Sequence, residues 1–255
     1  MAIQTIIPGA DFSESGIGYY GESWPPIGAL KWAGMFGHAY PEDPSYDYSL
    51  RGKRATMHGL VTPLTGSYAE PDQVAWWTLP YTDEELLESG VPGSLTIAAV
   101  VKWLNNGEDG VPASSYNTST TPGLKMEVDK AAGTMQMHTY AGGVSADTVS
   151  RAPGLSAGGW EFMASVWSPS GMALYRKGAA DSAMLVSTGS YVNGSAPGTQ
   201  NPRAFRVGRD WNGNVAGGCA VAGLAVYDIA ANSAQIDKIY SGIKSWLAAH
   251  AGPVI

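Results

Sequence analysis

Short apolar runs separated by turn residues recur from residue 95 to residue 228, and they constrain the fold more than any other feature of the chain. Residues 95–103 (LTIAAVVKW) are almost continuously apolar, which is typical of a strand covered on both faces. Residues 124–130 alternate strictly between apolar and charged side chains, and residues 134–140 resume the alternation after a short Ala-Ala-Gly turn. These two runs predict a hairpin with one apolar face.

Further runs of the same kind follow along the chain. Residues 160–168 and 172–178 flank a Pro-Ser-Gly turn and predict a second hairpin, and residues 203–209 and 220–228 supply two more strands. Many short strands at this spacing favour an all-β sandwich or jelly roll over a parallel α/β sheet.

One helix is expected, at the end of the chain. Asn232, with Gln235 three residues later, is similar to a capping box. Apolar residues then recur at helical spacing, and Gly252-Pro253 ends the pattern: Ile236, Ile239, Tyr240, Ile243, Trp246 and Leu247. No break in composition marks a domain boundary, so we expect one domain over residues 28–255, preceded by an N-terminal arm at residues 1–27.

Charge and composition exclude several classes of function. The chain has 15 Lys and Arg against 22 Asp and Glu, and a net charge of -7 disfavours a nucleic-acid partner. No run approaches the roughly 18 apolar residues of a membrane span. Cys219 is the single cysteine, so we expect neither an intramolecular disulfide nor a cysteine zinc cluster. Residues 1–10 lack the pattern of a secretory signal, so we do not expect export by that route.

Four segments, taken in order, carry a resemblance to a known superfamily. They are a strand-like run at 94–103, the hairpin at 124–140, a Trp-led pair of runs at 158–178, and residues 203–240. The last segment is the most specific, because its strand reads Ala-Gly-Leu-Ala-Val-Tyr-Asp and precedes a short capped helix. Together they resemble the laminin-G-like branch of the concanavalin A-like lectin/glucanase superfamily, and residues 28–80 resemble its opening more loosely.

The resemblance implies a two-sheet antiparallel jelly-roll sandwich with a short C-terminal helix. It does not by itself imply one function, because the superfamily includes glycan binders, glycosidases, adhesion modules and structural parts of virions. Residues 6–18 (IIPGADFSESGIG) also resemble the N-termini of bacteriophage and prophage structural proteins of this type.

This second resemblance, together with the absence of a secretory signal, disulfides and a complete catalytic motif, predicts a non-enzymatic virion component, tail-associated or surface-displayed, that contacts host surface glycans. Its partners would be other virion proteins or copies of itself. The arm carries apolar side chains that need burial, and we expect them to pack on a neighbouring subunit: Ile3, Ile6, Ile7, Tyr19 and Tyr20. Two alternatives stay open: a lectin or polysaccharide-degrading enzyme, and a purely structural capsid or tail decoration protein.

A partial catalytic motif weighs against the enzyme. The glucanase branch uses Glu, one residue, Asp, and a second Glu two or three residues later. Glu127-Val128-Asp129 begins this pattern, but Ala131 and Ala132 stand where the second Glu is required. A retaining glycosidase needs two carboxyl groups about 5–5.5 Å apart. We therefore expect Glu127 and Asp129 to be solvated strand residues and the protein not to be an enzyme.

A loop tryptophan is the best candidate for a sugar contact. The CH face of a pyranose packs on an aromatic ring while its hydroxyls pair with amides and carboxylates. Two constellations fit this chemistry, the first stronger than the second: Trp211 with Asp210, Asn212 and Asn214, and Tyr191 with Asn193. Packing of Trp211 against a neighbouring subunit is the alternative interpretation.

Histidines and loop oxygens give weaker signals. His138 shares a strand face with Gln136 and is either a sugar contact or, more simply, a cross-strand polar residue. Some laminin-G-like domains hold calcium at a sheet rim, so the resemblance implies Asp109 and Asp210 as candidate calcium ligands, with hydrogen-bonded turns as the alternative. No other cofactor is expected. Four tryptophans within strand or helix patterns are expected in the core: Trp103, Trp160, Trp167 and Trp246.

Overall fold

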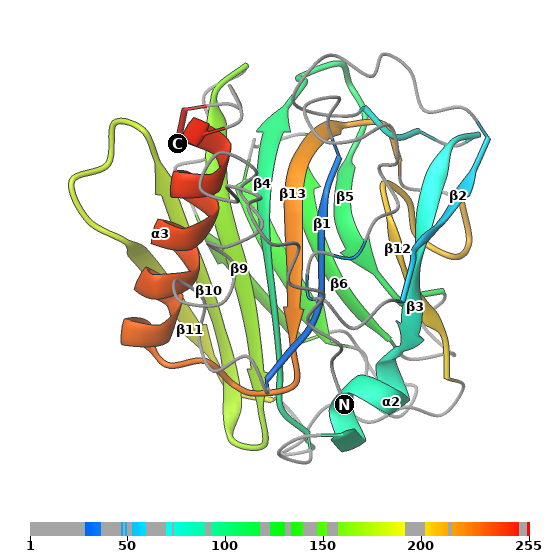
Figure 1. Ribbon diagram of the computed structural model, residues 1–255, viewed down its shortest axis with the longest axis horizontal. Helices are drawn as coiled ribbons and strands as arrows, with labels where there is room; N and C mark the ends of the chain where they lie inside the picture. The colour runs from blue at the N-terminus through cyan, green and yellow to red at the C-terminus, as the bar shows by residue number, and fades with distance from the viewer. Residues whose placement is uncertain are drawn as a thin grey trace, which may run out of the picture.

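The computed structural model describes residues 29–36, 47, 49, 53–59, 70–72, 74–89, 93–117, 123–130, 134–139, 147–151, 158–191, 202–213, 216–249 and 254–255. Within this part of the chain, two antiparallel sheets pack face to face, and a helix lies across the outside of one of them (Figure 1). This is the jelly-roll sandwich expected from the sequence. The predicted assembly residues Ile3, Ile6, Ile7, Tyr19 and Tyr20 lie outside the described residues.

Each sheet combines strands that are distant in sequence. The six-stranded sheet has the order β1 (Leu30–Met35), β13 (Cys219–Tyr227), β4 (Leu95–Trp103), β9 (Trp160–Ser168), β10 (Gly171–Gly178) and β11 (Leu185–Gly189). The seven-stranded sheet has the order β2 (Thr56–His58), β3 (Trp76–Thr82), β12 (Ala204–Val207), β5 (Gly110–Ser114), β6 (Leu124–Asp129), β7 (Thr134–Thr139) and β8 (Asp147–Arg151). Helices α2 (Asp83–Ser89) and α3 (Ser233–Ala249) complete the described elements.

Both predicted hairpins are confirmed. β6 pairs with β7 in register from Leu124↔Thr139 to Asp129↔Thr134, and β9 pairs with β10 around the turn that precedes Gly171. The apolar positions of β6 and β7 point into the core between the sheets, as the alternation requires. Gly171 in this turn has a φ of +158°, which side chains rarely adopt, and a Cβ there would lie 2.8 Å from the Gly189 carbonyl oxygen.

β4 is buried on both faces, as its continuous apolar run predicts. Ile97 and Val101 belong to the core between the sheets, whereas Ala98 and Val100 face a second core beneath α3. In Figure 1 this helix lies along β9 and β10 on the outer side of the six-stranded sheet. Of the four tryptophans expected in the core, Trp167 is fully buried, and Trp103, Trp160 and Trp246 are partly buried and pack against the two cores.

The predicted capping box at the start of α3 is confirmed. The Asn232 amide nitrogen donates to Gln235 Oε1 at 2.9 Å, and the Gln235 amide nitrogen donates to Asn232 Oδ1 at 3.0 Å. Thr96 on β4 holds the approach to the helix, because its hydroxyl donates to the Ile229 carbonyl and accepts from the Ala231 amide. None of the described helices is both long and apolar enough to span a membrane.

The sequence interpretation missed the short helix α2. Thr82 and Glu85 form the same reciprocal cap, with the Thr82 amide donating to Glu85 Oε2 at 2.8 Å and the Glu85 amide donating to Thr82 Oγ1 at 3.2 Å. Leu86 and Leu87 anchor the helix in the core between the sheets.

The cap of α3 gives the first testable prediction. Asn232→Ala removes the side-chain acceptor and is expected to destabilise the protein by about 1 kcal/mol. Urea denaturation followed by circular dichroism measures the loss. Asn232→Asp retains a side-chain oxygen that can accept the Gln235 amide and is the matched control. An equal loss of stability in both variants would contradict a role for the cap.

Candidate functional site

Alternation along β6 and β7 builds a polar surface on the outside of the seven-stranded sheet. Met126 and Val128 enter the core, so Lys125, Glu127 and Asp129 point to the opposite side. The pairing of β6 with β7 sets His138 opposite Lys125. One register row therefore crosses five strands of this sheet: Thr78, Arg206, Ser114, Lys125 and His138. We call these residues, with Glu127, Gln136 and Trp76, the polar face.

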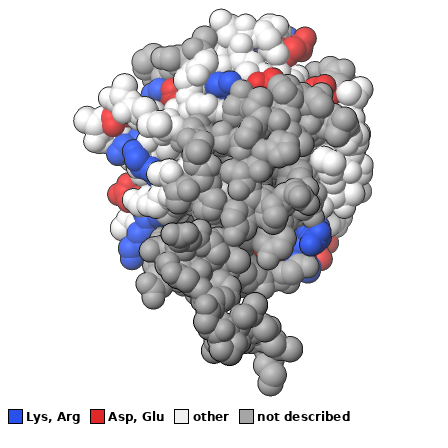
Figure 2. Space-filling view, turned by 45° about the horizontal axis from the view of Figure 1, so that its top comes forward, with Lys and Arg blue, Asp and Glu red and all other residues white. Residues whose placement is uncertain are grey.

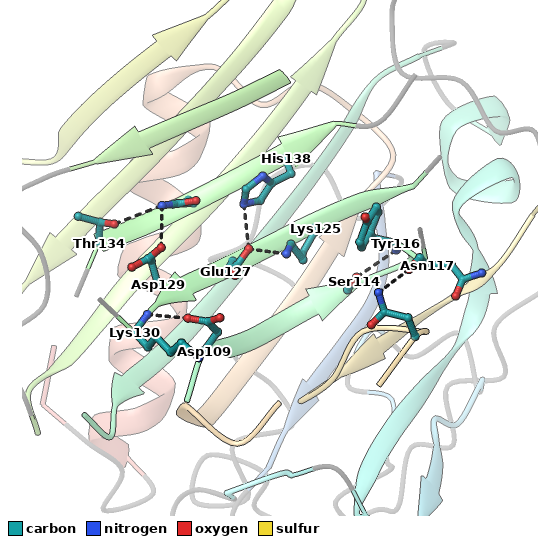
Figure 3. A network of polar contacts seen from close by, with 12 residues as sticks. Asp109, Ser114, Tyr116, Asn117, Lys125, Glu127, Asp129, Lys130, Thr134 and His138 are labelled. Atoms are coloured by element: carbon teal, nitrogen blue, oxygen red, sulfur yellow. Dashed lines mark hydrogen bonds and ion pairs between the residues drawn. The ribbon is translucent and has the colours of Figure 1, made fainter. Parts of the chain in front are cut away.

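Glu127 lies at the centre of an ion cluster on the polar face. Its Oε2 lies 2.5 Å from Lys125 Nζ and 2.9 Å from His138 Nε2 (Figure 3). All three residues are buried, with Glu127 only 8% exposed. The expectation that Glu127 is a solvated strand residue is therefore wrong, because its neighbours on β6 and β7 supply the partners that allow a carboxylate to be buried. His138 is the cross-strand polar residue of the simpler interpretation.

The environment of Glu127 fixes its protonation state. Burial opposes ionisation, but the hydrogen bond to His138 and the charge of Lys125 outweigh it and lower the pKa of Glu127 to about 2. A general acid needs a raised pKa, so this carboxylate is unsuited to protonate a leaving group near neutral pH.

The other acidic candidates are Asp109, Asp129 and Asp210. Asp109 Oδ1 accepts a hydrogen bond from the Lys130 amide at 2.7 Å, which ties the residue before β5 to the end of β6. Gln136 Nε2 donates to Asp129 Oδ2 at 3.4 Å (Figure 3). Asp210 is completely buried. No group of three or more potential metal-ligating His, Cys, Asp or Glu side chains occurs among the described residues.

Trp211 is held in a fixed position beside the polar face. Its amide nitrogen donates to the Tyr116 carbonyl and its indole Nε1 donates to the Ala204 carbonyl, each at 2.9 Å. Asn212 Nδ2 donates to the Asn117 carbonyl at 2.6 Å. These bonds tie the loop after β12 to the end of β5 and leave the Trp211 side chain partly exposed. Asn214, the fourth member of this predicted constellation, lies outside the described residues.

The second predicted constellation is not an exposed platform. Tyr191 is 8% exposed, packs in the core between the sheets, and donates its hydroxyl to the Ser168 carbonyl at 2.7 Å. Its hydroxyl also lies 3.2 Å from the Gly171 carbonyl, so the residue closes the β9–β10 turn. Asn193 lies outside the described residues. Tyr191 was misassigned because local sequence shows no strand period that would place its ring inside.

Arg206 connects Trp211 to a second tryptophan that sequence reasoning missed. The Arg206 guanidinium carbon lies 3.7 Å from the Trp211 ring centroid and 5.4 Å from that of Trp76. Arg209 lies 4.4 Å from the same Trp76 ring, and His58 stacks on it at 4.9 Å. The alternation of residues 76–79 could have identified Trp76, because it points this side chain to the face of the strand opposite to that of the buried Trp77 and Leu79.

A bridge joins the tryptophan region to the ion cluster. Lys125 Nζ, which pairs with Glu127, also lies 5.4 Å from the Tyr116 ring centroid. The Tyr116 carbonyl in turn accepts a hydrogen bond from the Trp211 amide. The ion cluster and the loop after β12 are thus connected through Lys125 and Tyr116, although Lys125, Glu127 and His138 are themselves buried. In the view of Figure 2, described acidic and basic side chains are interspersed and form no large patch of one sign.

Comparison with known proteins identifies the family and the fold. Residues 76–237, more than half of the chain, match a family model described as the concanavalin A-like lectin/glucanases superfamily. A comparison with curated proteins gave no significant sequence match.

Solved structures with the same fold include parts of bacterial toxins. The receptor binding domain of botulinum neurotoxin mosaic serotype C/D has a TM-score of 0.59 at 10% identity, covering 85% of this chain and 51% of that chain. The serotype D binding domain has a TM-score of 0.58 at 9% identity, covering 85% and 52%. A structure of type C, whose cell entry is described as dependent on two ganglioside molecules, has a TM-score of 0.59 at 10% identity, covering 85% and 52%. The present chain therefore spans about half the length of these solved chains.

The low pKa of Glu127 predicts how stability depends on pH. The unfolded carboxyl has a pKa of 4.5 and the folded one about 2, so the stabilisation is complete above pH 4.5 and is lost as pH falls toward 2. The stabilisation that corresponds to this difference in pKa is about 3 kcal/mol. Glu127→Gln should lower the free energy of unfolding near pH 6, and its difference from the wild type should shrink between pH 4.5 and pH 2.

Urea denaturation at a series of pH values measures this difference. Asp237→Asn is the matched control, because it removes an exposed carboxylate on α3 and should not reproduce the loss of stability near pH 6. A Glu127→Gln profile parallel to the wild type would show that the carboxylate is not held in the cluster.

Proposed function

We propose that this chain, which belongs to the concanavalin A-like lectin/glucanases superfamily, is a non-enzymatic carbohydrate-binding protein. The observation that carries the proposal is the partly exposed Trp211, fixed by backbone hydrogen bonds beside amides and cations of the polar face. A fixed indole lowers the entropy cost of binding, and its apolar surface suits the CH face of a sugar ring. The ganglioside dependence described for one structural neighbour is consistent with this use of the fold.

Two features support a binding rather than a hydrolytic role. Glu127 is ionised with a pKa of about 2, so it is not poised as a general acid. Ala131 and Ala132 stand where the glucanase motif requires its second Glu. Release of reducing sugar from a polysaccharide by the wild type, abolished in Glu127→Gln, would overturn the non-enzymatic proposal.

For the biological setting we propose a bacteriophage or prophage particle, in which the protein is tail-associated or surface-displayed and contacts host glycans. This proposal rests on the resemblance of residues 6–18 to N-termini of phage structural proteins. The arm at residues 1–27 would then pack on another virion protein or a second copy through its apolar side chains.

Purified particles test this setting. Mass spectrometry of particles induced from a lysogenic host should detect the chain at a constant ratio to the major structural proteins through successive density gradients. Deletion of residues 2–20 should abolish its incorporation. Recovery of the protein only outside the particles would contradict the virion role.

Substitution of Trp211 tests carbohydrate binding directly. Trp211→Ala removes the indole and should weaken binding to any glycan that the wild type retains on a glycan array by about tenfold or more, because stacked aromatic contacts contribute of the order of 1 kcal/mol beyond their buried area. Titration calorimetry with the retained glycan measures the change.

Trp246→Ala is the matched control for this experiment. It also removes a partly buried indole, but from α3 on the other side of the sandwich. It should bind the glycan as the wild type does, and circular dichroism should show that both variants are folded. Absence of binding by the wild type across the array would leave a purely structural role.

A further inference from the structure

Arg206 lies on the polar face next to Thr78, and its charge is not matched by a carboxylate contact among the described residues. Its guanidinium stacks on Trp211, and its Nη1 reaches only the carbonyl oxygens of Asp210 and Trp211, at 3.4 and 3.5 Å. Its Nε is buried and has no hydrogen-bond partner. No ion pair involving Arg206 occurs among the described residues, in contrast to Arg176, which forms a two-pronged pair with Glu161. The guanidinium is therefore incompletely paired, and an anion at the partly exposed side chain would offset the cost of leaving its charge without a carboxylate.

A second guanidinium lies next to the first. Arg206 and Arg209 both approach the ring of Trp76, at 5.4 and 4.4 Å from its centroid. Gly213 leaves room for Arg209. Its φ of +75° suits glycine, and a Cβ there would lie 2.1 Å from Arg209 Nη2. Both arginines are only partly buried, so a ligand on the polar face can reach them.

The two cations are held together at an electrostatic cost. Burial lowers the pKa of Arg206, and the charge of Arg209 lowers it further, while the buried Asp210 acts in the opposite direction without cancelling these effects. An anion bound between the guanidinium groups would offset their repulsion, and a planar oxyanion suits the fork of N–H donors.

We propose that Arg206 and Arg209 form a subsite for the carboxylate or sulfate group of an acidic saccharide whose sugar ring packs on Trp211. This inference rests on the proposed carbohydrate-binding function and specifies its ligand class. The Arg206 guanidinium covers one face of the Trp211 ring at 3.7 Å, so the sugar would pack on the opposite face, with the anion subsite next to the edge of the ring. Recognition of a charged substituent and of an apolar ring face therefore occurs at adjacent points of one surface.

Matched pairs of saccharides test the proposal with the full chain. The probes are oligogalacturonate and its methyl ester, which differ in the carboxylate, and chondroitin sulfate and its desulfated form, which differ in the sulfate. Binding is measured by titration calorimetry at low and high ionic strength. The wild type should bind the charged member of at least one pair about tenfold more tightly than its partner, and added salt should weaken that binding. The pair that shows the difference identifies the anion.

Two substitutions connect the discrimination to the arginines. Arg206→Met keeps an apolar stem between the two indoles but removes the charge, and Arg209→Gln removes the second charge. Each should reduce the ratio of charged to uncharged affinity within the discriminating pair about tenfold. Lys238→Gln is the matched control, because it removes an exposed cation from α3 and should change neither affinity.

The outcomes separate this inference from the function on which it rests. If the protein binds neutral glycans through Trp211 but does not distinguish the members of either pair, the anion subsite is refuted and the carbohydrate-binding function stands. If Lys238→Gln weakens acidic binding as much as Arg206→Met, the attraction comes from overall charge and the subsite is likewise refuted. If no saccharide binds, charged or neutral, both proposals fail.

Discussion

Alternation along β6 and β7 determines which side chains the seven-stranded sheet presents outward, and the polar face depends on it. With Met126 and Val128 buried between the sheets, the intervening Lys125 and Glu127 must point outward, toward His138 on the neighbouring strand. A shift of one residue in this pairing would place the charges in the core and the methionines outside. Burial of Met126 and Val128 thus places Lys125 and Glu127 beside His138.

Two buried carboxylates of this molecule have partners of opposite charge. Glu127 is matched by Lys125 and His138 on the polar face, and Glu161 is matched by Arg176 between β9 and β10. Breaking such a pair leaves one charge buried and uncompensated, which is more costly than never having the pair. Arg206, which is only partly buried, has aromatic rings and carbonyl oxygens around it and no carboxylate contact among the described residues. This contrast with the two ion pairs is the basis of the anion subsite proposed for it.

The sequence was sufficient to predict the parts of the fold that rest on local periodicity. The two hairpins, the doubly buried β4 and the cap at Asn232 each follow from residues close together in the chain. The candidate site was predicted only in part, because Trp211 lies in a loop whose polar neighbours are visible in sequence, whereas Arg206, Trp76 and Tyr116 come together through strand pairing across long separations. Tyr191 was misassigned for the same reason, since its burial depends on β9 and β10.

Helix α3 covers the outer side of the six-stranded sheet and gives the sandwich two unlike faces (Figure 1). The geometry imposes an orientation on any complex formed at the polar face, in which α3 points away from the bound surface. Exposed side chains of this helix, such as Lys238, are therefore suitable points for attaching a label or a solid support. Several copies displayed in this way would present their polar faces in parallel, so that weak individual contacts add up to avidity.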